Sequence, residues 1–264
     1  MSEPSVNSVQ ASTPSASNTA VSIPSGRKIL SARLLHAVPL SADVRHLEFG
    51  VADAEEFPFV AGQFVSIQQP KPDGKIHTRA YSIASAPRPS PSFDLCLNRV
   101  ENGFLSNWLC DLEEGATVAF HGPHGMFTLR QPHQDCVFIA TGTGIAPMRG
   151  MLHWLFAHSA RHEGREYWLA YGTRYESGLY YHDEFRAIEQ AHPNFHYVPT
   201  LSRGGSEWRG LRGYVQDHVR DIVGSRRDVQ AYICGLHDMV DANRKLLKDE
   251  LGWERSQIVF ERYD

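Results

Sequence analysis

Apolar and polar positions alternate differently in the two halves of the chain. Between residues 28 and 130 the apolar positions fall in short runs, which are separated by turn residues such as Pro70, Asp73 and Gly74. Four of these runs cover residues 29–34, 44–49, 63–67 and 93–97. Short strands at this spacing are typical of a small antiparallel barrel, for which we predict six strands. A short helix is expected near residues 106–112.

From Asp135 onward the pattern changes to alternating strands and helices. Residues 136–140 form a fully apolar run, as expected for a strand that is buried on both faces. Further strands are predicted at 166–171, 195–201 and 229–234, and helices at 147–160, 181–191, 214–222 and 239–251. Such an alternation predicts an open, mostly parallel sheet. We therefore expect a barrel domain over residues 26–131 and an α/β domain over residues 132–264.

The N-terminal segment differs from both halves. Residues 1–25 are rich in Ser, with Pro, Ala, Thr and Asn, and contain no Lys or Arg. Such a composition cannot bury enough apolar surface to offset the entropy lost on ordering. The segment also lacks the basic start and the apolar middle of a secretory signal. We expect a disordered tail.

Composition narrows the possible functions. Of the 264 residues, 42% are apolar and 21% are charged, which is ordinary for a globular protein. The net charge of −4 gives no sign of the clustered basic face that nucleic-acid binding requires. No apolar run approaches the roughly 20 residues of a membrane-spanning helix.

The cysteines and histidines point away from metal chemistry. The four cysteines, at positions 96, 110, 136 and 234, contain no C-x-x-C pair, so they fit neither a zinc site nor an iron–sulfur cluster. A disulfide framework is not expected in a chain of this size without a secretory signal. None of the 14 histidines falls in a complete metal-ligand spacing. We expect no metal, and a monomer in a reducing cytoplasm.

Two motifs in the first half carry candidate cofactor chemistry. In the run Arg79-Ala80-Tyr81-Ser82, strand alternation places Arg79 and Tyr81 on one face and Ser82 on the other. A cation, a flat ring and a hydroxyl are groups that an isoalloxazine and its phosphates need. Further on, Gly103-Phe104-Leu105-Ser106 opens the predicted short helix, where backbone amide groups favour a phosphate. Ser106 fits either as the N-cap of this helix or as a phosphate ligand.

Three further motifs lie in the second half. Thr141-Gly142-Thr143-Gly144-Ile145-Ala146-Pro147 follows a buried strand and opens a helix, which is the context of a phosphate-binding turn. Proline stands where the dinucleotide fingerprint has its third glycine, and it suits the first helical turn. Cys234-Gly235-Leu236 ends a later strand, and Glu261-Arg262-Tyr263-Asp264 closes the sequence.

In this order the motifs resemble those of the ferredoxin–NADP⁺ reductase family, over roughly residues 27–264. The resemblance implies an FAD-binding antiparallel barrel followed by an NADP-binding α/β domain. It also implies an enzyme that transfers hydride between NADPH and FAD N5, and single electrons between FAD and ferredoxin or flavodoxin. Because the chain lacks the cysteine cluster of a fused ferredoxin, the electron acceptor is expected to be a separate protein.

The resemblance further implies roles for individual residues. Catalytic roles fall on Ser82, Cys234, Glu261 and Tyr263, with Tyr263 stacking on the flavin and Glu261 hydrogen-bonding near Ser82. Contacts with FAD are implied for Arg79, Ala80, Tyr81, Ser82, Gly103, Phe104, Leu105, Ser106 and Tyr263. Contacts with NADP are implied for Thr141, Gly142, Thr143, Gly144, Pro147, Arg174, Ser202, Arg203, Arg212, Cys234, Gly235 and Leu236. The chain departs from the plant-type pattern at Asp264, since the tyrosine is terminal in that pattern.

The choice of nucleotide rests on arginines. No acidic residue follows the second strand of the parallel sheet, where Arg174 stands instead. The guanidinium groups of Arg174, Arg203 and Arg212 suit the 2′-phosphate of NADPH, and Ser202-Arg203 is similar to the site in NADP-linked members. Residues 208–215 also resemble a stretch of NADH-using oxygenase reductases. We predict NADPH, and two alternatives stay open: an NADH-linked reductase component of an oxygenase system, and a non-catalytic nucleotide-binding regulatory subunit.

Overall fold

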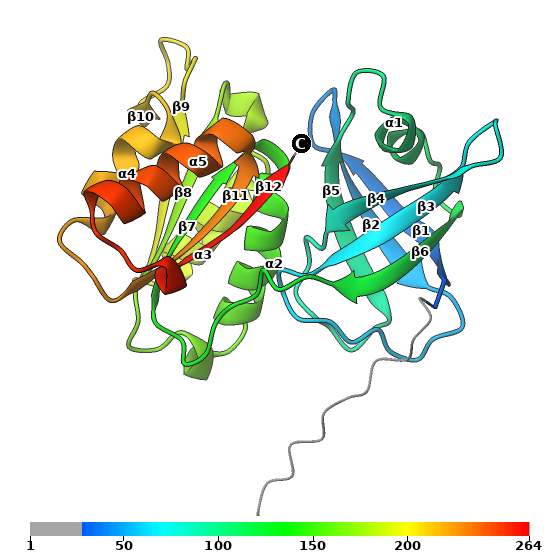
Figure 1. Ribbon diagram of the computed structural model, residues 1–264, viewed down its shortest axis with the longest axis horizontal. Coiled ribbons are helices and arrows are strands. Elements are labelled where there is room, and N and C mark those ends of the chain that lie inside the picture. Colours follow the sequence, from blue (N-terminus) through cyan, green and yellow to red (C-terminus); the bar gives the residue numbers. More distant parts are fainter. Residues whose placement is uncertain (1–27, 264) are drawn as a thin grey trace, which may run out of the picture.

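Two β-sheets lie side by side in the computed structural model, which describes residues 28–263 (Figure 1). The predicted disordered tail and Asp264 lie outside the described residues, so the predictions for them stay predictions. The chain passes from the first sheet to the second between His124 and Asp135.

Six antiparallel strands form the first sheet. They are β1 (Leu30–Pro39), β2 (Val44–Val51), β3 (Phe64–Pro70), β4 (Ile76–Ser82), β5 (Ser92–Asn98) and β6 (Thr117–His124). Their order is β4-β3-β6-β1-β2-β5, and a bridge between Ile83 and Leu95 joins the two ends of the sheet. Phe49, Phe93 and Phe120 are fully buried in the core. The predicted six-stranded antiparallel barrel is confirmed.

The short helix α1 (Phe104–Cys110) begins two residues earlier than the sequence predicted. Leu105, Leu109 and Cys110 are buried in the apolar core of the barrel. This packing presses the helix against the barrel and fixes where its first turn lies.

Six parallel strands form the second sheet. They are β7 (Asp135–Thr141), β8 (Tyr167–Thr173), β9 (Phe195–Leu201), β10 (Leu211–Arg212), β11 (Val229–Leu236) and β12 (Ile258–Tyr263). Helices cover both faces, as Figure 1 shows. These helices are α2 (Ile145–Phe156), α3 (His182–Ala191), α4 (Val215–Val223) and α5 (His237–Lys245). The predicted open parallel sheet is confirmed, and the edge strands β10 and β12 are additions that the apolar pattern did not predict.

Separate apolar clusters lie on the two faces of the parallel sheet. Met148 and Leu152 of α2 and Phe185 of α3 pack on one face. Val219 of α4 and Val240 of α5 pack on the other face. The last predicted helix is shorter than expected, because α5 gives way to a π-helical turn over Leu246–Glu250.

The strand order β10-β9-β8-β7-β11-β12 reverses direction at β7. The chain runs from β7 outward through β8 to β10, and then returns to place β11 on the other side of β7. Connections therefore leave the carboxyl ends of β7 and β11 on opposite sides. In open parallel sheets this arrangement opens a crevice in which ligands bind.

Helix α2 lies between the parallel sheet and the barrel (Figure 1). Ala146 of this helix packs with Val44, Ala84 and Cys96 of the barrel in a small buried cluster. The two halves therefore share an apolar contact. Over residues 28–263, no helix combines the length and the apolar character needed to cross a membrane.

Candidate active site

The turns that end β7 and β11 are packed against each other at the centre of the parallel sheet. The backbone N–H of Leu236 donates a hydrogen bond of 3.3 Å to the Thr141 side-chain oxygen. A Cβ on Gly144 would lie 2.3 Å from the Cys234 carbonyl oxygen, and a Cβ on Gly235 would lie 2.3 Å from the Thr141 side-chain oxygen. Only glycine therefore permits this approach at both positions.

The other parts of the predicted nicotinamide loop surround this contact. Gly142, with a φ of +53°, has open space where a Cβ would be, so its backbone faces a free volume. Pro147 lies in the first turn of α2, as its position in the motif predicted. The Thr143 hydroxyl donates to the Asn98 side-chain oxygen at 3.4 Å, which connects the loop to strand β5 of the barrel.

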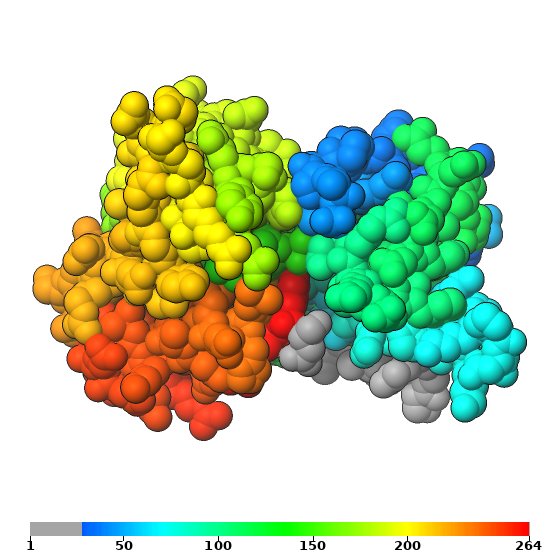
Figure 2. Space-filling model, turned by 90° about the horizontal axis from the view of Figure 1, so that it is seen from above, coloured from blue at the N-terminus to red at the C-terminus, as the bar shows by residue number. Residues whose placement is uncertain are grey.

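The four residues predicted to be catalytic meet between the two halves. Ser82 ends β4, and its hydroxyl donates a hydrogen bond of 3.5 Å to a carboxyl oxygen of Glu261. Glu261 pairs with Cys234 across β12 and β11. Tyr263 ends β12 opposite Leu236, and the Ser82 and Cys234 side chains lie near enough to its phenol to influence its pKa. Figure 2 shows the C-terminal strand, in red, between the two halves of the molecule.

Burial controls the protonation of these groups. Desolvation raises the pKa of Glu261 to about 7, although the hydrogen bond from Ser82 acts in the opposite direction. Desolvation also raises the pKa of the Cys234 thiol, and the nearby Glu261 adds to the shift. A neutral buried thiol is a poor nucleophile. The structure thus offers a carboxyl group that gains and loses a proton near neutral pH.

Strand β4 and helix α1 form the predicted flavin side of the site. His77 contacts Phe104 edge-on, with ring centroids 5.8 Å apart, so this face of β4 lies against α1. By strand alternation Arg79 and Tyr81 share that face. Arg79 is exposed, and Tyr81 is partly buried against the core of the barrel. Ala80 projects from the opposite face.

Ser106 is not the N-cap that the sequence allowed. The N-cap of α1 is Gly103, and Ser106 is the third residue of the helix. Its hydroxyl oxygen is buried and has no hydrogen-bond partner among residues 28–263. A Cβ on Gly103 would lie 2.5 Å from that oxygen. The hydroxyl is therefore free to bind an external acceptor, whereas the side chain of Leu105 is buried in the barrel core.

The carboxyl ends of β8 and β9 bring Arg174, Ser202 and Arg203 together. The backbone N–H of Ser202 donates to the Thr173 carbonyl at 3.0 Å, and that of Arg203 donates to the Arg174 carbonyl at 2.8 Å. A hydrogen bond with the Tyr175 side chain raises the pKa of Arg203. Two cations and a hydroxyl thus share one rim of the sheet.

Two exposed tyrosines at this rim were missed by the sequence reasoning. Tyr175 is 52% exposed and Tyr214 is 64% exposed. Both lie near enough to Arg203 to raise the pKa of its guanidinium. An exposed aromatic ring beside a cation can cover a flat base. The available signal was a tyrosine directly after Arg174 and another after the glycine that follows Arg212.

Arg212, which pairs with Leu201 at the end of β9, is bonded to the loop that follows this strand. Its guanidinium donates hydrogen bonds of 2.7, 2.7 and 2.9 Å to the carbonyl oxygens of Gly204, Gly205 and Trp208. These bonds hold the loop between β9 and β10. Three of the five guanidinium N–H donors are used in this way, so Arg212 supports the loop, and its predicted contact with NADP stays a prediction.

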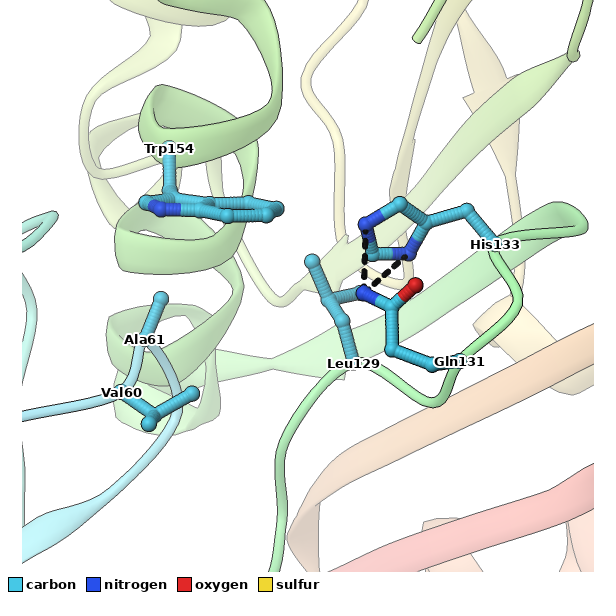
Figure 3. A pocket seen from close by; sticks show the side chains of 6 residues that line it. All are labelled: Val60, Ala61, Leu129, Gln131, His133 and Trp154. Atoms are coloured by element: carbon cyan, nitrogen blue, oxygen red, sulfur yellow. Dashed lines mark hydrogen bonds between the residues drawn. The ribbon is translucent and has the colours of Figure 1, made fainter. Parts of the chain in front are cut away.

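A separate cavity of about 190 Å³ lies near the other end of α2 (Figure 3). Its lining residues come from the barrel, from the connection between the halves and from α2: Val60, Ala61, Leu129, Gln131, His133 and Trp154. None of the predicted site residues is among them. The cavity does not belong to the candidate active site.

Comparison with known proteins agrees with this geometry. Residues 31–129 match the model of the oxidoreductase FAD-binding domain, and residues 138–245 match that of the oxidoreductase NAD-binding domain. The two matches fall on the barrel and on the parallel-sheet half.

Three relatives show how far the likeness extends. Ferredoxin–NADP reductase B of Sorangium cellulosum is 46% identical over 242 residues, which cover 88% of this chain and 97% of the relative. The phenol 2-monooxygenase reductase component DmpP of a Pseudomonas strain is 34% identical over 211 residues, which cover 78% of this chain but only 58% of the relative. The crystal structure of the Amycolatopsis cytochrome P450 reductase GcoB superposes with a TM-score of 0.80 at 30% identity, covering 94% of this chain and 73% of that one.

Fold, motif geometry and sequence likeness agree over both halves of the chain. The first relative is matched over 97% of its length at 46% identity, which is ample to establish a common family. The protein belongs to the ferredoxin–NADP⁺ reductase family of FAD- and nicotinamide-nucleotide-binding oxidoreductases.

Proposed function

We propose that this protein transfers hydride from NADPH to the N5 position of bound FAD and passes electrons one at a time to a separate ferredoxin or flavodoxin. The observation that carries the proposal is the convergence of Ser82, Glu261, Tyr263 and Cys234 beside the β7 and β11 turns. These residues come from both halves, and they lie beside the strand reversal, where open parallel sheets bind ligands.

The arrangement supports a defined task for each side chain. Bound FAD accepts the two electrons of a hydride together and releases them singly. Glu261 holds a proton up to about pH 7 and accepts a hydrogen bond from Ser82. With FAD bound, the pair could exchange a proton with flavin N5. The buried Cys234 and the partly buried Tyr263 enclose this pair and limit its access to water. No covalent bond to the protein is needed.

The proposed FAD site lies on the barrel, in an FAD-binding domain over residues 26–131. The unpartnered Ser106 hydroxyl beside Gly103 fits a phosphate acceptor. Exposed Arg79 lies on the face of β4 that borders α1, where it can neutralise phosphate charge. Tyr81 on the same face offers a ring edge for the isoalloxazine. Together these residues fit the group that the family binds.

The proposed NADPH site lies in an NADP-binding domain over residues 132–264. Arg174, Ser202 and Arg203 supply two cations and a hydroxyl at one rim. A phosphate with up to two negative charges matches this set, and the forked guanidinium binds it through paired donors. The Gly142 turn, with open space beside it, would receive the pyrophosphate.

The proposed partner is a separate electron-transfer protein. The relative with 46% identity is named a ferredoxin–NADP reductase, which supports ferredoxin as the acceptor. Flavodoxin, a cytoplasmic setting and a monomeric state stay predictions from the sequence.

An NADH-linked reductase component of an oxygenase system is the second candidate. The likeness to a phenol 2-monooxygenase reductase component supports it, although this chain spans little more than half of that relative. The chemistry at Ser82 and Glu261 would be the same. The two candidates differ in the nucleotide and in the electron acceptor.

Anaerobic stopped-flow absorbance separates these functions. Fast bleaching of the flavin band by NADPH, with NADH far slower, is the result expected for the first proposal. Equal or faster reduction by NADH would favour the oxygenase-reductase alternative. Bound flavin that neither nucleotide reduces would refute catalysis and favour a regulatory, nucleotide-binding role.

A variant at the rim tests the 2′-phosphate assignment. Replacing Arg203 by Ala should raise the KM for NADPH about 10- to 150-fold, because a hydrogen bond to a charged group contributes about 1.5–3 kcal/mol. The KM for NADH should stay unchanged. The exposed Arg227, near the amino ends of the strands, provides the matched control Arg227→Ala. An equal effect of Arg203→Ala on both nucleotides would contradict the assignment.

A further inference from the structure

Arg149 of α2 joins three segments that are far apart in the sequence. Its Nη1 donates to the Ala84 carbonyl at 2.9 Å and to the Asp94 carboxylate at 3.3 Å, both in the barrel. Its Nε and Nη2 donate to the two carboxyl oxygens of Glu184 in α3, at 2.7 and 3.2 Å. All three nitrogen atoms of the guanidinium are thus used, and they point to acceptors in both halves.

The position of Arg149 relates these contacts to the reacting groups. Arg149 lies one helical turn after the Gly142–Gly144 turn, in the helix that this turn opens. Ala84 lies two residues after Ser82 in the same extended run. The guanidinium therefore links the Gly142–Gly144 turn, at the start of its own helix, to Ser82, which lies two residues before Ala84.

The backbone of α2 makes the same contact independently. A Cβ on Gly150 would lie 2.7 Å from the Ser85 carbonyl oxygen and 3.3 Å from that of Ile83. Ala146, one turn earlier, packs against Ala84 in the buried cluster between the halves. Residues 146, 149 and 150 share one face of a helix, so this whole face lies against the chain that follows Ser82.

Arg149 and Asp94 are largely enclosed, whereas the Glu184 side chain is 37% exposed. The side chain of Arg149 is 14% exposed and that of Asp94 is 7% exposed. Asp94 also receives a hydrogen bond of 2.6 Å from Arg88, and the Arg149 guanidinium lies 4.6 Å from the centre of the Tyr181 ring. Removing the guanidinium would leave the buried Asp94 carboxylate without one of its cationic partners, which is costly in a site of low exposure. Lysine could not replace the forked set of donors.

We propose that Arg149 is a positioning residue for hydride transfer, which sets the Gly142–Gly144 turn relative to the Ser82 strand. The inference rests on the proposed function, because it concerns the distance between the nucleotide and the flavin. A misplacement of about 1 Å far from the reacting atoms can cost about 100-fold in rate. Arg149 reaches neither Arg203 nor Ser106, so nucleotide and flavin affinity should be set elsewhere.

The test compares three variants of the FAD-loaded full chain. Arg149→Met removes the contacts of the guanidinium. Gly150→Ala displaces the same helix face from Ser85 without changing any charge. Arg161→Met is the matched control, because Arg161 is a partly buried arginine that stacks on Trp154 of α2 and donates to its carbonyl, away from the flavin strand. Stopped-flow flavin reduction gives the limiting rate at saturating NADPH, and titration gives the Kd for NADP⁺.

We expect Arg149→Met and Gly150→Ala each to lower the limiting rate about 10-fold or more, with Kd within about twofold of wild type and the flavin spectrum unchanged. Arg161→Met should keep the wild-type rate. If Arg149→Met does not fold, Gly150→Ala alone decides. Wild-type rates in the variants, a loss shared by the control, or a parallel loss of NADP⁺ affinity would overturn the inference. A wild-type protein that neither nucleotide reduces would instead refute the proposed function, and the inference with it.

Discussion

Replacing Glu261 by Gln should make the protein more stable at alkaline pH and leave its stability unchanged at acidic pH. Burial raises the pKa of this carboxyl from 4.5 to about 7 in the folded protein. Between these two values the folded state keeps its proton while the unfolded state releases it. The free energy of unfolding therefore falls as the pH rises through this window.

The size of the effect follows from the width of the window. At about 1.4 kcal/mol for each pH unit between 4.5 and 7, the penalty for ionising the buried carboxyl reaches about 3 kcal/mol above pH 7. Glutamine carries no proton equilibrium, so Glu261→Gln removes the penalty. For a chain of this length, about 3 kcal/mol corresponds to about 6–12 °C in Tm.

Thermal unfolding of wild type and Glu261→Gln across pH 4.5 to 8, at one fixed FAD concentration, measures this difference. The two Tm values should agree at pH 4.5 and diverge steadily to pH 8, with the variant the more stable. Glu113→Gln, at an exposed position, is the control and should follow wild type throughout. A constant difference in Tm across the pH range would refute the reasoning, because it would show that Glu261 ionises without penalty.

Two further substitutions test the packing and the charges. Gly144→Ala should lower the free energy of unfolding by about 1–3 kcal/mol and raise the KM for NADPH, because the new Cβ would overlap a backbone carbonyl at the end of β11. Gly205→Ala is the control, because a Cβ there meets open space, and it should change neither thermal unfolding nor KM. Burial alone would raise the pKa of Glu184, but hydrogen bonds from His153 and Arg149 lower it to about 2. Glu184→Gln should therefore reduce stability at pH 7, and acid titration should show that deficit vanishing as the pH falls from 4.5 towards 2, whereas a deficit that persists at pH 2 would contradict this cause.

Local sequence patterns predicted the parts of the fold that depend on local chemistry. The strand, glycine turn and helix around Gly142 were predictable, because an apolar run before the turn and a proline in the first helical turn leave few other structures. Short alternating runs likewise predicted the antiparallel barrel. The resemblance then brought Ser82 and Glu261 into one site, which their separation in the sequence does not reveal.

Contacts between distant segments could not be predicted from local patterns. The guanidinium of Arg149 is meaningful only once Asp94 and Glu184 are placed around it, and nothing in the sequence near Arg149 identifies these partners. The bonds from Arg212 to the carbonyl oxygens of its own loop likewise could not be read from the sequence. Ser106 lies three residues after the N-cap Gly103, and Leu105 and Leu109 of the same helix are buried in the barrel core, a contact that local sequence does not reveal.

The loop after β9 and the turns after β7 and β11 are held by separate sets of bonds. Arg212 fastens the first to its own carbonyls, whereas Thr141 fastens the other two to each other. Within residues 28–263, no side chain belongs to both sets of bonds. Because the two sets of bonds are separate, substitutions in the loop after β9 can accumulate during evolution without displacing the turns after β7 and β11.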